Sequence, residues 1–229
     1  MQLEKETLEN NYKLVIDLEM CDTVKPQFKQ KAGKLHEIIQ IGAVLLDRNN
    51  NEVKRFSTYV KPEYSIIRKT ITNLTGITYD DVKDAPKLDQ ALNSLTDIII
   101  EPNKTTLCTW SNSDTKAIEQ EMKVKKLKNE VIDSLCRSFF DIQKDFNTKV
   151  KIGNRINLAK ALELVGLDFE GTAHGALVDA VNTAKLYTAM QDDKHVKEVI
   201  KLVEELLTDK PCTSTIGDMF DFSQFNLEE

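Results

Sequence analysis

Three segments with strand-like patterns near the N-terminus constrain the fold of this chain more than any other feature. Residues 12–17 and 38–46 are apolar and rich in β-branched side chains, and residues 53–60 alternate loosely between apolar and polar side chains; each has a length typical of a strand. The second segment is interrupted only by Gln40 and Gly42, and a polar cluster follows it at residues 47–51. Because such clusters form turns, we predict an antiparallel meander of three strands.

The rest of the chain alternates between strand and helix patterns. Residues 106–110 and 138–142 predict two further strands, and apolar side chains recur at helical spacing over residues 88–99, 115–127, 158–165 and 176–190. A meander followed by strands that alternate with helices is typical of an α/β fold. We therefore expect a five-stranded mixed sheet flanked by helices.

The pattern changes after Met190. Residues 194–207 predict an amphipathic helix with Val196, Ile200, Val203 and Leu207 on one stripe, and the acidic segment 209–229 is typical of a poorly ordered tail. With 229 residues, 41% of them hydrophobic, the chain can bury one substantial core. We expect one domain over residues 1–192 and a C-terminal extension over residues 193–229. The extension either packs back on the domain, pairs two subunits or binds a protein partner.

Composition limits the possible functions. The net charge is −6, and residues 209–229 contribute −4 of it through five acidic residues and one lysine, which leaves −2 for the rest. Proteins that clamp long nucleic acids are strongly basic, so this composition argues against a long clamp. It would allow only short contacts with a strand end, with metal ions supplying positive charge. No apolar run approaches the roughly 18 residues of a membrane span, and the N-terminus lacks a secretory pattern. The widely spaced cysteines are expected to be reduced and the location cytoplasmic; these thiols are Cys21, Cys108, Cys136 and Cys212.

Two carboxylates mark the end of the first predicted strand. Asp17 and Glu19 are two residues apart, so their side chains point to the same side while Leu18 turns into the core. Neighbouring carboxylates repel each other unless a divalent cation lies between them, and hard oxygen ligands suit Mg²⁺ or Mn²⁺. Acidic pairs recur by chance in a chain with 37 acidic residues. The place of this pair directly after an apolar strand nevertheless favours metal binding.

Three more candidates follow predicted elements. Asp114 comes four residues after Trp110, just past a strand; taken alone, this position favours the N-cap of the next helix. His174 and Asp179 are five residues apart, which corresponds to about 140° around a helix. The two side chains therefore cannot share one helix face. We expect His174 on a loop at Gly175 and Asp179 on the inner face of the helix that follows.

The order D-x-E, W-x-x-x-D and H-x-x-x-x-D resembles that of the DEDDh exonucleases, which have an RNase H-like fold. The intervening sequence resembles them too, in E-I-I-Q-I-G-A-V (37–44), F-S-T-Y-V-K-P (56–62), I-T-N-L-T-G-I-T (71–78), F-F-D-I-Q-K (139–144) and L-A-K-A-L-E-L-V-G-L-D-F-E-G (158–171). The resemblance covers residues 13–190 and is greatest to the histone-mRNA and small-RNA trimming branch and to bacterial KapD-like relatives. Met20, Cys21 and Ser111 depart from the family pattern without removing a ligand, and they bear on how the terminal sugar is held.

This resemblance implies a metal-dependent 3′→5′ exonuclease that removes nucleoside 5′-monophosphates from the 3′ ends of single-stranded nucleic acid, with RNA favoured over DNA. Asp17, Glu19 and Asp179 would hold one Mg²⁺ or Mn²⁺ ion. Asp17 would bridge to a second ion, which Asp114 would support through water. Paired ions of this kind lie about 4 Å apart and stabilise the attacking and leaving oxygens. His174 would be the general base, because an imidazole titrates near neutral pH.

The resemblance also implies substrate contacts, at Leu18, Met20, Leu74 and Trp110. In related enzymes the leucine of the L-T-G-I segment packs against the terminal base, so Leu74 is a candidate wedge with little sequence specificity. The alternative is that Leu74 and Ile77 anchor a helix cap against the sheet. A lysine cluster could steer a phosphate backbone, but a solvated helix end is the favoured interpretation of it; its members are Lys123, Lys125, Lys126 and Lys128.

The alternative of another class is a catalytically silent, regulatory module that binds nucleic acid or protein on an exonuclease fold. The association of KapD-like relatives with sporulation control keeps this alternative open. Degenerate binders usually lose a carboxylate or the histidine, whereas all five residues are present here. The sequence therefore favours the enzyme.

Overall fold

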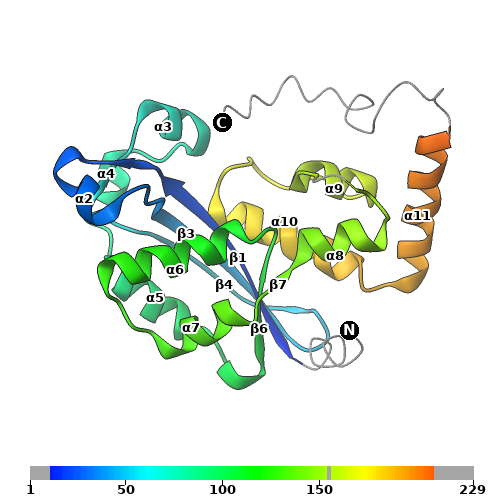
Figure 1. The fold of residues 1–229 in the computed structure, drawn as a ribbon. Coiled ribbons are helices and arrows are strands. Elements are labelled where there is room, and N and C mark those ends of the chain that lie inside the picture. The colour runs from blue at the N-terminus through cyan, green and yellow to red at the C-terminus, as the bar shows by residue number, and fades with distance from the viewer. Residues whose placement is uncertain (1–10, 154–155, 209–229) are drawn as a thin grey trace.

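The computed structural model describes residues 11–153 and 156–208 (Figure 1). Its main sheet has five strands in the order β4-β3-β1-β6-β7. β1 pairs antiparallel with β3 and β3 with β4, whereas β1 pairs parallel with β6 and β6 with β7. The predicted meander and the five-stranded mixed sheet are thus confirmed. The strand bounds are β1 Tyr12–Cys21, β3 Glu37–Leu46, β4 Glu52–Tyr59, β6 Thr105–Thr109 and β7 Phe140–Asp141. The short strands β2 Thr23–Val24 and β5 Ser65–Ile66 pair separately.

The helices predicted from periodicity are confirmed. They are α5 Leu88–Thr96, α6 Ser113–Lys125, α9 Leu158–Leu164, α10 Ala176–Ala189 and α11 Asp193–Thr208. Five further helices were not predicted: α2 Lys29–Ala32, α3 Lys69–Thr75, α4 Tyr79–Val82, α7 Glu130–Arg137 and α8 Ile142–Lys149. Each has eight residues or fewer, which leaves few repeats of the apolar spacing, although α9, with seven residues, was recognised. Two 3₁₀ turns, at Pro26–Phe28 and Pro102–Lys104, complete the described elements.

The two faces of β1 pack against different helices. Leu14, Ile16 and Leu18 belong to a core cluster with side chains of α5, α6 and α7. Val15, on the opposite face, clusters with β3, β6 and α10. This alternation follows from the two-residue period of a strand. It places the side chains of Asp17 and Glu19 on the face that α10 covers.

Two strands differ from their predicted bounds by more than one residue. β1 continues past Asp17 to Cys21, because Met20 and Cys21 still pair with β3. On its other side, however, the pairing of β1 with β6 stops at Ile16. The carboxylates thus lie inside a strand, but just beyond the end of its parallel neighbour. β7 is limited to two residues, because α8 begins at Ile142, within the predicted strand.

Helix α11 packs back on the domain, beside α8 and α9 (Figure 1). Its contact stripe agrees with the predicted one at Val196 and Val203. Val199 takes the place predicted for Ile200, which is not part of that cluster, and Leu206 packs there as well. The side chain of Leu207 and the predicted tail lie outside the described residues.

The described cysteines are buried and free; they are Cys21, Cys108 and Cys136. Cys212 lies outside the described residues. Within residues 11–153 and 156–208, no helix combines the length and the apolar character needed to cross a bilayer.

Candidate functional site

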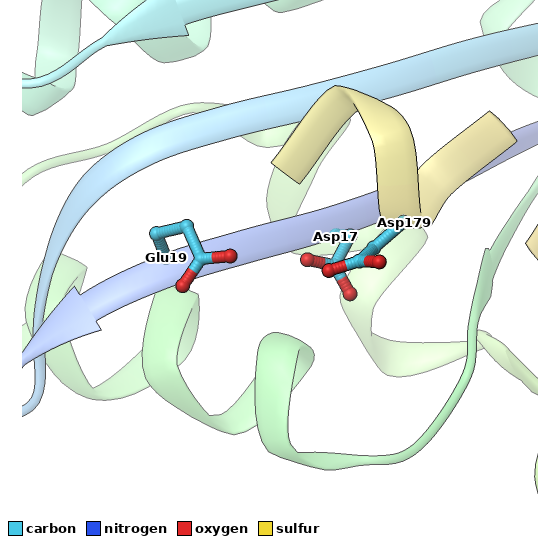
Figure 2. A group of neighbouring side chains, drawn as sticks. All are labelled: Asp17, Glu19 and Asp179. Atoms are coloured by element: carbon cyan, nitrogen blue, oxygen red, sulfur yellow. The ribbon is translucent and has the colours of Figure 1, made fainter. Parts of the chain in front are cut away.

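Three carboxylates from two elements converge on one face of the sheet. Asp17 and Glu19 extend from β1, and Asp179 extends from the first turn of α10 (Figure 2). Each offers one oxygen such that these atoms all lie within 4.8 Å of one another. The pair predicted from β1 and the carboxylate predicted 160 residues later are therefore brought together by the docking of α10 on the sheet.

Asp114 lies beside this group. β6 runs parallel to β1 and ends at Thr109, so the turn that follows it leads into α6 next to the carboxylates. The N-cap of α6 is Asn112, which makes the N-cap alternative for Asp114 wrong. The Asp114 side chain is instead buried and helps to raise the pKa of both Asp17 and Glu19. It is not part of the three-carboxylate group.

The four acids are held in an environment that disfavours their ionisation. Part of the Asp17 residue is exposed to solvent, but its carboxyl group is largely surrounded by protein atoms. Desolvation therefore raises its pKa well above the ordinary value, and the charges of Asp114, Asp179 and Glu19 add to the effect. Burial is likewise the main cause that raises the pKa of Glu19 to about 7 and that of Asp114 to about 7. Burial also raises the pKa of Asp179, against the hydrogen bond and charge of His174.

This negative charge has little compensation in the described part of the chain, where the charge of His174 acts on Asp179. No lysine or arginine among the described residues forms an ion pair with the four acids. Converging carboxylate oxygens are the ligands that hard divalent cations prefer. A bound cation would favour the ionised acids and reverse the effect of burial. The residues present thus fit one or more divalent metal ions.

His174 lies in the turn that precedes α10. Its backbone has φ = 65°, a left-handed conformation that is uncommon outside glycine. Its N–H donates a hydrogen bond to Asp179 Oδ2 at 3.0 Å. Its side chain is exposed, and among the described contacts the imidazole does not bond to the four acids. The structure thus places the imidazole at the rim of the site, next to Asp179.

The predicted substrate contacts occupy different environments. Leu18 is 5% exposed and packs in the core, so only its backbone can face a substrate. Met20 is half-buried against the same cluster. Trp110 is half-buried, with its ring centroid 6.2 Å from that of Phe146. Leu74, on α3, is 53% exposed, whereas Ile77 is buried among Cys21, Ile39 and Val82. Ile77 therefore provides the anchor, and Leu74 does not.

The interpretation of the lysine cluster as a solvated helix end is wrong for one member. Lys123, Lys126 and Lys128 are exposed, but the Lys125 side chain is 3% exposed. Its ammonium lies 2.8 Å from Glu37 Oε1 and 2.7 Å from Glu121 Oε1. Glu37 also accepts backbone hydrogen bonds from residues 63–65. The spacing of four residues between Glu121 and Lys125 was the only sequence signal for this network.

Comparison with known proteins finds relatives that are named as exonucleases. The RNase_T family model, described as an exonuclease, matches residues 14–187. 3′-5′ exoribonuclease 1 of Rattus norvegicus is 28% identical over 193 residues, which is 80% of this chain and 54% of the relative. The chain thus spans about half the length of that relative. The probable 3′-5′ exonuclease KapD of Bacillus subtilis (strain 168) is also 28% identical, over 82% of this chain and 84% of KapD.

Solved structures agree with these sequence relatives. The nuclease domain of 3′hExo, a DEDDh family member bound to rAMP, has a TM-score of 0.68 and 26% identity, over 80% of this chain and 93% of that chain. A 3′-exonuclease that recognises the 3′ end of a histone mRNA stem-loop also gives a TM-score of 0.68 at 26% identity, over 80% of this chain and 83% of that chain. The match of the family model includes all five candidate residues, from Asp17 to Asp179. The chain therefore belongs to the RNase T exonuclease family and has the RNase H-like fold of the DEDDh 3′-exonucleases.

Proposed function

We propose that this chain is a divalent-metal-dependent 3′→5′ exonuclease that removes nucleoside 5′-monophosphates from the 3′ ends of single-stranded RNA. The observation that carries the proposal is the convergence of Asp17, Glu19 and Asp179, with Asp114 beside them. Four partly desolvated acids without a cationic partner among the described residues are costly unless a cation binds them. Such an arrangement is expected of a metal-binding site.

Asp17, Glu19 and Asp179 would hold a Mg²⁺ or Mn²⁺ ion, and Asp17 would help to hold a second, which Asp114 would support through water. Bound divalent ions stabilise the attacking and leaving oxygens of an in-line displacement at phosphorus. His174, exposed at the rim, would accept the proton of the attacking water. Its backbone bond to Asp179 holds it next to a ligand while leaving its imidazole free to reach the substrate.

Two features support a short, sequence-tolerant contact with RNA. Leu74 presents an exposed apolar surface, on which any base can pack. Relatives at 28% identity are named as exoribonucleases, which favours RNA over DNA for this chain. Outside residues 209–229 the net charge is only −2, so the chain has no net positive charge with which to hold a long strand. We therefore expect contacts with only the last few nucleotides.

The test is cleavage of 5′-labelled single-stranded RNA, beside DNA of the same sequence, with Mn²⁺, with Mg²⁺ and with chelator. We expect a metal-dependent ladder that shortens from the 3′ end, more rapidly on RNA, and that disappears in Asp17→Asn. Asp89→Asn, at an exposed position of α5 on the opposite side of the sheet, is the matched control and should retain the parent rate. Binding of either strand without cleavage would refute the proposal in favour of the regulatory module.

A further inference from the structure

The strand next to the carboxylates carries an unusual pair of residues. Asp17 lies directly opposite Gly42 on β3, and Glu19 lies directly opposite Gln40. After Glu37, the first residue of β3, these are the two positions that interrupt an otherwise apolar strand. Both contact the same residue of a third element, Ala176, which is the first residue of α10.

Gly42 allows the backbone of α10 to rest directly on β3. A Cβ atom added at Gly42 would lie 2.1 Å from the carbonyl carbon of Ala176 and 2.2 Å from the nitrogen of Leu177. Contacts this short with backbone atoms cannot be relieved by a change of rotamer. Only glycine therefore permits the observed approach of the helix to the sheet.

Gln40 supplies the hydrogen bond that the start of α10 needs. The first N–H groups of a helix have no partner within the helix, and the N-cap here is Gly175, which has no side chain. Gln40 Oε1 accepts the N–H of Ala176 at 3.1 Å. Because Ala176 is fully buried, loss of this acceptor would leave a buried donor unsatisfied.

The turn that leads into α10, from His174 to Ala176, is held at a second point. The N–H of His174 donates to Asp179 Oδ2, and His174 has the left-handed backbone conformation described above. The turn from His174 to Ala176 is thus fixed to α10 at one end and to β3 at the other. Its position relative to Asp17 and Glu19 depends on the pairing of β3 with β1.

We propose that Gln40 and Gly42 are positioning residues, which set the distance of Asp179 and His174 from the two carboxylates of β1. The effect of these residues on catalysis rests on the proposed function, whereas their role in docking α10 on β3 does not. Neither residue is proposed to touch substrate or metal. They act through Ala176, so their loss should lower the turnover number kcat more than it changes KM.

The first experiment measures amide hydrogen exchange in the metal-free protein. Gln40→Met removes the acceptor with little change in side-chain length, and we expect faster exchange at Ala176 and its neighbours in the first turn of α10. Gln191→Met is the matched control, because Gln191 donates its amide to Tyr187 O at the other end of α10. It should leave exchange in the first turn unchanged. Unchanged exchange in Gln40→Met would refute the role of Gln40 in holding the start of α10 on β3.

The second experiment measures kinetics on labelled RNA. Gln40→Met should lower kcat about tenfold, as expected for loss of one buried hydrogen bond, with little change in KM. Combined with His174→Ala, it should cost less than the product of the two single effects, because Gln40 acts partly through His174. Multiplicative effects, or a rise in KM alone, would overturn the positioning role. Gln40→Glu keeps the acceptor oxygen and should keep slow exchange at Ala176.

Gly42→Ala provides an independent test, because it should displace α10 from β3. A folded variant should bind Mn²⁺ more weakly, since Asp179 moves away from Asp17 and Glu19, whereas Mn²⁺ binding at the parent affinity would contradict the inference. If Gly42→Ala does not fold, the Gln40 variants carry the test. A parent protein that cleaves no nucleic acid would refute the proposed function but leave the exchange experiment decisive for the docking.

Discussion

Replacing Glu19 by glutamine should make the metal-free protein more stable, because one charge is removed from a group of closely spaced acids. Burial, followed by the charges of Asp179 and Asp114, raises the pKa of Glu19 from 4.5 to about 7. The folded protein therefore binds this proton more tightly than the unfolded chain does, and ionised Glu19 destabilises the fold. The cost is absent below pH 4.5, grows as the pH rises and is complete above about 7.

The size of the effect follows from the shift. One pKa unit corresponds to about 1.4 kcal/mol, so a rise from 4.5 to about 7 amounts to about 3 kcal/mol near pH 8 and about 1.4 kcal/mol near pH 5.5. Glu19 is 8% exposed, so solvent screens this charge only weakly. For a chain of this size, 3 kcal/mol raises the Tm by roughly 6–12 °C.

Thermal and urea unfolding in chelator, near pH 8 and near pH 5.5, would measure this gain. Glu198→Gln, at an exposed position of α11, is the matched control and should change stability little. Added Mn²⁺ should stabilise the parent strongly and Glu19→Gln weakly, because the variant lacks a ligand. The reasoning is refuted if Glu19→Gln is no more stable than the parent near pH 8 in chelator, or if its advantage does not shrink at the lower pH.

Three further predictions follow from the contacts of single side chains. His174→Ala should lower turnover roughly 10²–10⁴-fold with Mn²⁺ affinity by calorimetry near that of the parent, because the backbone bond to Asp179 persists; parallel loss of affinity would make His174 a ligand. Leu74→Ala should raise KM on RNA several-fold without lowering the Tm, since the side chain is 53% exposed; a lower Tm with unchanged KM would assign it a structural role. Lys125→Met should destabilise the protein by about 3–5 kcal/mol in urea unfolding, because Glu37 and Glu121 lose their buried partner. Exposed Lys123→Met is the control, and equal stability of the two variants would contradict this prediction.

Much of the fold could be predicted because its patterns are local. The period of two in β1 separates Leu18, in the core, from Asp17 and Glu19, in the site, and the spacing of five separates His174 from Asp179. Long helices such as α10 repeat their apolar pattern often enough to be recognised. Shorter helices repeat it less often, and α3 and α7 were missed, although α9, with seven residues, was recognised.

The errors arose where the partner of a side chain lies far away in the sequence. Lys125 has the composition of a solvated helix end, but the acids that bury it come from β3 as well as from its own helix. The predicted stripe of α11 shares Val196 and Val203 with the buried one, but Ile200 was chosen in place of Val199 because packing on the rest of the domain selects the buried face. For Asp114, preference for the N-cap was overruled by its packing beside β1.

The sequence by itself determined which residue types are available: an ordered set of four acids and a histidine, placed on strands and helix starts by short-range periodicity. Only the tertiary structure decided how close they come to one another. Asp17 and Asp179 meet because β3 presents Gly42 and Gln40 to the backbone of α10. Such an approach depends on atoms from three separate segments, and no spacing within one segment encodes it.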